Sequence, residues 1–134
     1  EQFRIGAAFR AGSPWLLELV AGLVEPGETP AEVAVRETAE ESGCTVHELL
    51  PIAGYYSSPG GTDEYFHLFC ARVNLDGVRE LHGMAGEHED IRLHVIPYAK
   101  LEEMQRDGRF DNAHTLIALQ WLHLERDGIR RAWT

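Results

Sequence analysis

Three glutamates lie close together in one short stretch of the sequence, at positions 37, 40 and 41. In a helix with about 3.6 residues per turn, Glu37, Glu40 and Glu41 share one face, and only Arg36 stands beside them to offset their repulsion. A hard divalent cation would compensate, because Mg²⁺ prefers oxygen ligands and commonly takes one or two carboxylates together with substrate phosphates. The alternative is a solvated acidic face, and the spacing alone does not decide between the two.

The helix that must carry these glutamates is predicted by the residues at its ends. Thr29 is suited to cap it, Pro30 to occupy its first position and Glu32 to complete a capping box with Thr29. Gly43 is suited to end it. We therefore predict a helix over residues 30–42, preceded by a loop over residues 22–29 that contains two glycines and a proline.

Apolar and aromatic runs predict the remaining elements. We expect strands over residues 3–9, 15–20, 46–57, 64–73 and 91–96, and helices over residues 98–107 and 111–126. Residues 75–90 are polar and carry three glycines, which indicates a long loop. Strands on both sides of a central helix, with helices again at the end, indicate an α+β or α/β fold in which a mixed β-sheet lies between helices.

Composition limits the class of protein. The chain has 134 residues, 44% of them hydrophobic, so we expect one domain over residues 1–134. A formal net charge of −10 disfavours nucleic-acid binding, and no apolar run approaches the roughly 18 residues of a membrane span. Two cysteines, Cys44 and Cys70, are too few for a disulfide framework and are expected to be buried thiols, so we expect a cytoplasmic protein.

The residues around the glutamate cluster resemble the signature of the Nudix hydrolases. That signature consists of a glycine, five residues, Glu, seven residues, Arg-Glu, an apolar residue, any residue, Glu-Glu, any residue, glycine and an apolar residue. Its fixed positions are occupied here by Gly22, Glu28, Arg36, Glu37, Glu40, Glu41 and Gly43. Thr38 and Cys44 depart from it at two apolar positions, which concerns packing more than metal ligation. A signature with so many spaced positions is far more specific than a short glycine motif.

The resemblance implies a Nudix fold with a site for Mg²⁺ or Mn²⁺ that serves hydrolysis of a nucleoside diphosphate linked to another group. By their places in the signature, the expected metal ligands are the carbonyl of Ala21 and the carboxylates of Glu37, Glu40 and Glu41. Arg36 and Glu28 are expected behind these ligands, where a guanidinium can fork onto carboxylates and fix their orientation.

Across nearly its whole length the chain also resembles the bacterial Nudix enzymes that cleave ADP-ribose. A loop in that group supplies a catalytic base and a further metal ligand, and the matching residues here are Glu87 as the base and Glu89 as the ligand. Without the resemblance, both would be assigned as solvated loop charges. The substrate contacts that the same match implies are Arg4, Leu23, Ser58, Pro59 and Glu64.

The resemblance implies metal-dependent hydrolysis of ADP-ribose to AMP and ribose 5-phosphate. Two alternatives stay open: hydrolysis of other ADP-sugars or nucleoside diphosphate derivatives, and a non-catalytic module that binds ADP-ribose. Related enzymes carry a β-rich segment ahead of this region that helps to form a dimer. We therefore expect a homodimer and, because the sequence opens on Glu1 without an initiator methionine, a domain that is incomplete at its N-terminus.

Overall fold

A computed structural model of the chain describes residues 1–9, 13–76, 78, 81–82 and 91–133. The elements, in chain order, are β1 (Gln2–Phe3), the 3₁₀ helix η1 (Ile5–Phe9), β2 (Trp15–Leu16), α1 (Pro30–Ser42), β3 (Val46–Tyr56), β4 (Tyr65–Val73), β5 (Leu81–His82), β6 (Ile91–Arg92), α2 (Tyr98–Arg106) and α3 (Ala113–Ala132). All three predicted helices are therefore present, and both long strands.

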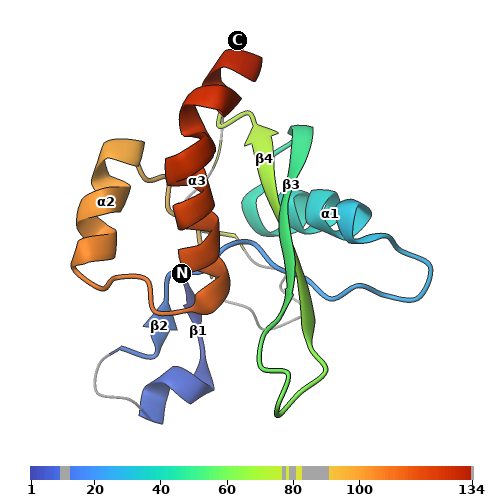
Figure 1. The fold of residues 1–134 in the computed structure, drawn as a ribbon, viewed down its shortest axis with the longest axis vertical. Coiled ribbons are helices and arrows are strands. Elements are labelled where there is room, and N and C mark those ends of the chain that lie inside the picture. The colour runs from blue at the N-terminus through green and yellow to red at the C-terminus, as the bar shows by residue number, and fades with distance from the viewer. Residues whose placement is uncertain (10–12, 77, 79–80, 83–90, 134) are drawn as a thin grey trace.

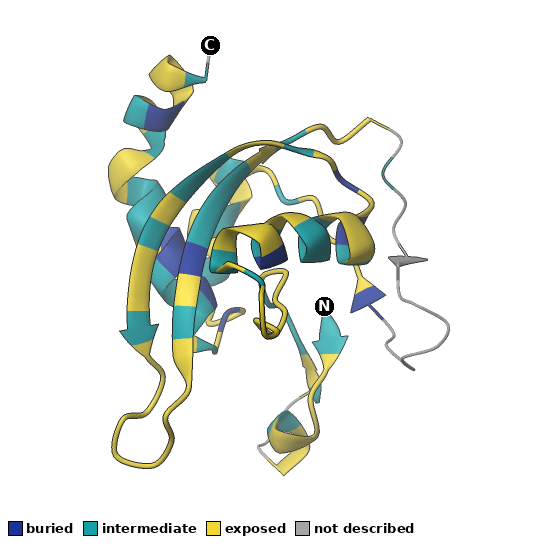
Figure 2. Cartoon of the chain, turned by 90° about the vertical axis from the view of Figure 1, so that its right-hand side faces the viewer, coloured by how far each residue is buried: buried dark blue, intermediate teal, exposed yellow. Residues whose placement is uncertain are grey.

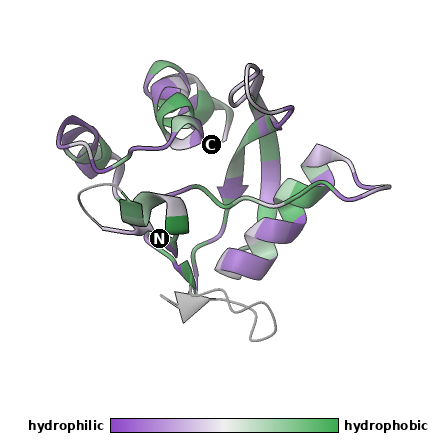
Figure 3. Cartoon of the chain, turned by 90° about the horizontal axis from the view of Figure 1, so that it is seen from below, coloured by the Kyte–Doolittle hydropathy of each residue, from purple (hydrophilic) through white to green (hydrophobic). Residues whose placement is uncertain are grey.

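The long hairpin β3–β4 forms the centre of the fold. Its strands pair antiparallel from Val46 with Val73 to Tyr56 with Tyr65. Helix α1 lies along one side of the hairpin, α3 lies along the other, and α2 lies beyond α3 (Figure 1 and Figure 3). This arrangement confirms the expected α+β class, with strands between helices.

Two smaller antiparallel pairs, β1–β2 and β5–β6, accompany the hairpin. Backbone hydrogen bonds run in both directions between Glu1 and Arg92, at 2.6 and 3.0 Å, and bring β6 alongside β1. All strand pairs within the described ranges are antiparallel. Where the sequence predicts one mixed sheet, the described residues form three separate two-stranded sheets.

The strand predicted over residues 3–9 is wrong. The pairing with Trp15–Leu16 involves Gln2–Phe3 alone, and Ile5–Phe9 form a 3₁₀ helix, with a turn closed from Ala7 N to Arg4 O at 3.0 Å. The stretch contains a glycine and two alanines, so it offers little of the branched surface that favours a strand.

Other boundaries differ because a strand extends only as far as its partner. Among the described residues, the strands predicted over residues 15–20 and 91–96 pair only at Trp15–Leu16 and Ile91–Arg92. The loop predicted over residues 75–90 contains β5, which pairs with β6. A two-residue strand in a polar stretch has no alternating pattern by which it could be predicted.

Helix α1 has the boundaries that its end residues predict. Glu32 N donates to Thr29 Oγ1 at 3.3 Å and Thr29 N donates to Glu32 Oε2 at 2.8 Å, which completes the capping box. The Glu32 carboxylate accepts hydrogen bonds from Thr29 N and, at 2.7 Å, from Thr29 Oγ1, and these two bonds lower the pKa of Glu32. At the other end Gly43 adopts a left-handed conformation with φ 66°, and its N–H donates to Ala39 O at 2.9 Å.

The buried side chains come from the hairpin, α1, α3 and the segments between them (Figure 2). The buried apolar residues are Val33, Cys44, Leu68, Ile91, Phe110, Ala118, Leu119 and Ile129. Cys44 is buried and Cys70 is half-buried, both as free thiols, and burial raises the pKa of Cys70. Within the described ranges, none of the helices has the length and apolarity to cross a bilayer.

Replacing Thr29 with alanine removes the side-chain acceptor of the capping box. We expect Thr29→Ala to lower the free energy of unfolding by about 1 kcal/mol, the usual cost of losing such a cap, as measured by urea denaturation. Thr29→Ser keeps the hydroxyl and is expected to retain most of the stability. Equal stability of the two variants would show that this cap does not stabilise α1.

Candidate functional site

The guanidinium of Arg36 lies among three carboxylates. Its Nε and Nη2 donate to the two oxygens of Glu28 at 3.0 and 3.2 Å, and Nη1 donates to Glu37 Oε1 at 2.7 Å and to Glu40 Oε2 at 3.1 Å. Glu37 and Glu40 belong to α1, whereas Glu28 belongs to the loop before it. The guanidinium of Arg36 therefore links the loop to the helix and binds two of the three clustered glutamates.

These hydrogen bonds keep Arg36 and Glu28 charged. The hydrogen bonds that Arg36 donates to Glu28 are the largest cause of the lowered pKa of Glu28. The pKa of Arg36 is raised, first by its hydrogen bonds to Glu28 and then by the one to Glu37. Because the folded-state pKa of Glu28 is lowered, its contribution to stability is complete above its unfolded-state pKa and is lost as the pH falls through the folded-state value. The pair is intact at neutral pH, although solvent limits its strength because both side chains are partly exposed.

Gly22 allows the loop before α1 to pass directly against Glu37. A Cβ atom at position 22 would overlap the Cγ, Cδ and Oε1 atoms of Glu37. The carbonyl of Ala21 is bonded to the amide nitrogen of Gly22. The absence of a side chain at position 22 therefore brings two of the predicted metal ligands, Glu37 and Ala21, into the same neighbourhood.

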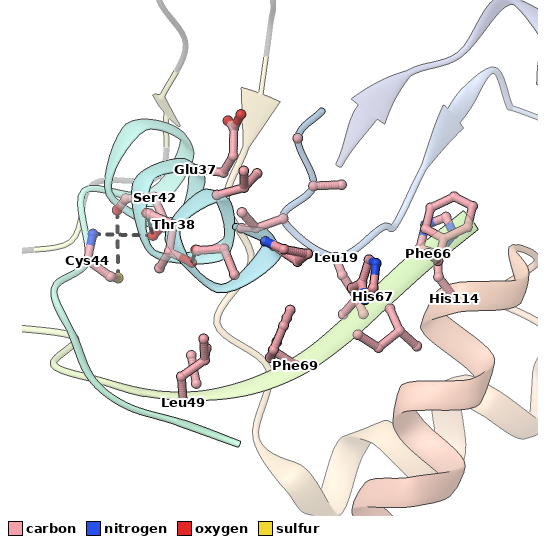
Figure 4. A pocket seen from close by; sticks show the side chains of 18 of the residues that line it. Leu19, Glu37, Thr38, Ser42, Cys44, Leu49, Phe66, His67, Phe69 and His114 are labelled. Atoms are coloured by element: carbon pink, nitrogen blue, oxygen red, sulfur yellow. Dashed lines mark hydrogen bonds between the residues drawn. The ribbon is translucent and has the colours of Figure 1, made fainter. Parts of the chain in front are cut away.

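A cavity of about 510 Å³ lies between α1, β4 and residues 19–24 (Figure 4). Four residues predicted to form the site, Ala21, Leu23, Glu37 and Glu64, line it together. The remaining lining is mostly apolar and includes Leu19 (Figure 4). A volume of this size is within the range of roughly 300–1,000 Å³ that is usual for small-molecule sites.

Aromatic rings form one wall of this cavity. Phe66 of β4 and His114 of α3 both line it and stack with ring centroids 5.3 Å apart, and Phe66 also stacks at 5.4 Å on Tyr55 of β3, which is not in the described lining. Burial is the largest influence on His114 and lowers its pKa, which favours the neutral imidazole. The carboxylates of Glu18 and Glu64 raise the pKa of His114, whereas the guanidinium of Arg4 lowers it further. All three charges therefore influence this imidazole.

The two departures from the signature, Thr38 and Cys44, both line the cavity (Figure 4). Thr38 Oγ1 donates to Ala34 O at 2.6 Å, so its hydroxyl is satisfied within the helix. Cys44 N donates to Ser42 Oγ at 3.2 Å, and Ser42 Oγ donates in turn to the carbonyl of Thr38. Both residues thus contribute to the packing at the C-terminal end of α1.

Glu41 lines a second cavity, of about 320 Å³, together with Glu18, Thr115 and other residues. Leu19 and Val20 line both cavities, so the segment that contains Ala21 adjoins both spaces. The three clustered glutamates, Glu37, Glu40 and Glu41, therefore do not share one cavity: Glu37 lines the larger and Glu41 the smaller.

Arg4 forms an ion pair that sequence reasoning missed. Its Nε donates to Glu18 Oε2 at 2.7 Å, and the side chain of Glu18 is 11% exposed whereas that of Arg4 is 46% exposed. One signal could have indicated Glu18 as a paired residue, because it is a single charge within the apolar run over residues 15–20.

Ser58 and Pro59 lie in the exposed connection between β3 and β4. The carbonyl of Ser58 accepts hydrogen bonds from the backbone of Gly61 and of Thr62, each at 2.9 Å. The described lining of the larger cavity includes Glu64 but neither Ser58 nor Pro59. Ser57, which sequence reasoning did not identify, contacts the Glu64 carboxylate: its Oγ donates to Glu64 Oε2 at 2.8 Å.

The predicted metal ligands fit a hard divalent cation by their chemistry, because all of them are oxygen donors. Glu87 and Glu89, the predicted base and further ligand, lie outside the described residues. In the part of the chain that the structure describes, no group of three or more acidic, histidine or cysteine side chains is arranged to hold a metal. The predicted ligands that lie within the described residues are Ala21, Glu37, Glu40 and Glu41, from α1 and the loop before it.

Comparison with known proteins indicates one family. Residues 4–119 match the NUDIX domain. The chain is 43% identical over 136 residues to an ADP-ribose pyrophosphatase of Haemophilus influenzae and 41% identical over 133 residues to an ADP-ribose pyrophosphatase of Escherichia coli K12, with 99% of the chain covered in both. It is 37% identical over 131 residues, 96% of the chain, to a GDP-mannose pyrophosphatase of Cronobacter sakazakii.

These alignments cover 63%, 64% and 65% of the three relatives, so the chain spans less than two thirds of their length. The family match, in contrast, takes in most of the chain, from Arg4 through α1 and the hairpin to Leu119. This match, together with the signature residues gathered around Arg36, shows that the chain belongs to the Nudix hydrolase family.

Proposed function

We propose that this chain carries the active site of a metal-dependent ADP-ribose diphosphatase, which hydrolyses ADP-ribose to AMP and ribose 5-phosphate. The observation that carries the proposal is the similarity of 99% of the chain to proteins named ADP-ribose pyrophosphatase. Because the chain spans less than two thirds of those relatives, the activity and substrate of the whole protein are part of the proposal.

The larger cavity supports the proposal. It joins Glu37, a proposed metal ligand, to Glu64, the residue proposed to face the terminal ribose. The remaining proposed contacts are Arg4, with a phosphate or beside the adenine, the backbone of Leu23, and Ser58 and Pro59 in the connection after β3. A single cavity with carboxylates from both regions suits a ligand that has a diphosphate at its centre and a sugar at its end.

The residues proposed to hold Mg²⁺ or Mn²⁺ are the carbonyl of Ala21 and the carboxylates of Glu37, Glu40, Glu41 and Glu89. When bound, the ions offset the charge of the diphosphate and stabilise the charge that develops during attack on phosphorus. Arg36 alone cannot supply this positive charge, because its guanidinium is already shared by three carboxylates. Arg36 and Glu28 instead orient the ligands.

Glu87 is proposed as the general base. It accepts a proton from the attacking water while the new oxygen–phosphorus bond forms. The bond from that phosphorus to the bridging oxygen breaks, and its electron pair stays with the departing phosphate. This role requires a carboxylate that remains available for the proton while other carboxylates hold the ions.

A second candidate function is hydrolysis of another nucleoside diphosphate sugar, which the 37% identity to a GDP-mannose pyrophosphatase favours. A panel of ADP-ribose, GDP-mannose and ADP-glucose, compared by kcat/KM with Mg²⁺, distinguishes the two. We expect the highest kcat/KM for ADP-ribose, and a higher value for GDP-mannose would favour the second candidate. Binding of ADP-ribose in calorimetry without release of AMP would instead indicate a non-catalytic binding module.

The proposal also concerns the setting in which the site works. We propose that residues 1–134 form one Nudix domain of a cytoplasmic homodimer that acts on a small molecule and binds neither nucleic acid nor membrane. The net charge of −10 supports the exclusion of nucleic acid. Light scattering of the purified protein after size exclusion measures the oligomeric state directly.

Replacing the proposed base separates proton transfer from metal binding. We expect Glu87→Gln to lower kcat by about 10²- to 10⁴-fold, while the Mg²⁺ concentration for half-maximal activity stays nearly constant. Glu48→Gln, on the exposed surface of the hairpin, is the matched control and should keep full activity. Unchanged turnover of Glu87→Gln would refute the assignment of the base.

The contact between Gly22 and Glu37 gives a second test. We expect Gly22→Ala to displace the Glu37 side chain, lower kcat by about tenfold or more and raise the Mg²⁺ requirement, because misplaced catalytic groups lose rate steeply. Gly128→Ala on α3 is the control, since its Cβ would meet only Glu125 Oε2 at an ordinary 3.9 Å. Full activity of Gly22→Ala at low Mg²⁺ would contradict the placement of Glu37 at the metal site.

A further inference from the structure

We propose that Glu18 is a positioning residue: it fixes the guanidinium of Arg4 through Nε, so that the two terminal amino groups of Arg4 are presented to the diphosphate of the substrate. The inference rests on the proposed function, because it concerns the binding of the same ligand. In this proposal Glu18 acts through Arg4 and does not itself contact the substrate.

The contact between Arg4 and Glu18 has the geometry that this role needs. Arg4 Nε and Glu18 Oε2 are 2.7 Å apart. Glu18 is the one carboxylate paired with Arg4 among the described residues, and the pair uses neither Nη1 nor Nη2. These two nitrogens form the fork with which arginine binds phosphate in a bidentate manner.

The exposures of the two side chains indicate which of them is fixed by the fold and which is open to a ligand. Glu18 is 11% exposed and Arg4 is 46% exposed. A nearly buried carboxylate must keep its partner, because an unpaired charge in that position is strongly unfavourable. The guanidinium, in contrast, is open to solvent, where a ligand can reach it. Glu18 is therefore the fixed member of the pair.

The backbone on both sides of the pair is held in place. Arg4 N donates to Pro14 O at 2.9 Å, next to the β1–β2 pairing. On the other side, the carbonyl of Leu17 accepts a hydrogen bond from Asn112 Nδ2 at 2.9 Å, and Asn112 caps α3 through Thr115 N at 3.1 Å. The position of Glu18 is thus set by the start of α3 as well as by the β1–β2 pair before it.

The pair lies close to the candidate site. Glu18 lines the smaller cavity together with Glu41, and the next residues of the chain, Leu19 and Val20, line both cavities. The charges of Arg4 and Glu18 also act on His114, which lines the larger cavity. Arg4 is in neither described lining, but its partner Glu18 shares the smaller cavity with Glu41, a proposed metal ligand.

The test compares ADP-ribose binding by calorimetry in metal-free buffer with AMP release in Mg²⁺. Glu18→Leu removes the acceptor, and we expect it to raise the Kd and the KM for ADP-ribose about tenfold with kcat within about twofold. Glu18→Gln keeps an acceptor oxygen for Nε and is expected to stay within about threefold of the native Kd. Glu48→Leu removes the exposed ion pair with Arg72, 2.9 Å long, and should leave both constants unchanged.

Circular dichroism checks that each variant folds, and Glu18→Ala, which cannot overpack the site, carries the same expectation as the leucine variant. Three results would each overturn the role of Glu18: native affinity in either variant, a loss confined to kcat, or no binding of ADP-ribose by the unmodified protein. Weaker binding by the leucine variant without AMP release by the unmodified protein would support Glu18 and refute hydrolysis.

Discussion

The site depends on one guanidinium that three carboxylates share. Arg36 joins Glu28 in the loop to Glu37 and Glu40 on α1, and three negative charges against one positive leave two uncompensated. These charges would oppose a diphosphate and weaken its binding, and cations would offset that repulsion, so the network that orients the proposed ligands would also make catalysis depend on metal. The caps of α1, the glycine before it and the hairpin behind it all maintain this geometry.

Local interactions explain which parts of the fold the sequence predicts. The ends of α1 are fixed by Thr29, Glu32 and Gly43, which act within one turn, and both boundaries of this helix are confirmed. The short strands depend on distant partners, so their limits could not be predicted, and residues 5–9 form a 3₁₀ helix instead of a strand. Helix α3 continues to Ala132, beyond the predicted end at residue 126, because Ile129 is buried and adds packing that outweighs the low helix propensity of a glycine.

The same distinction applies to the site. The contact of Arg36 with Glu40 could be anticipated because the two residues are four apart on one helix, whereas residues one apart, such as Arg36 and Glu37, do not ordinarily face each other. The pairing of Arg4 with Glu18 could not, because it depends on how the chain folds back between them. The larger cavity is a property of three elements packed together, and no spacing within a single element predicts which side chains will line it.

We propose that the carboxylates gathered around Arg36 hold a divalent cation against the loop at Ala21. Anomalous diffraction from crystals soaked in Mn²⁺ measures this directly, because the ion itself gives the signal. We expect a peak within coordination distance of the Ala21 carbonyl and the Glu37 carboxylate, with Arg36 still paired to Glu28. No peak there at saturating Mn²⁺, with these carboxylates turned to solvent, would contradict it.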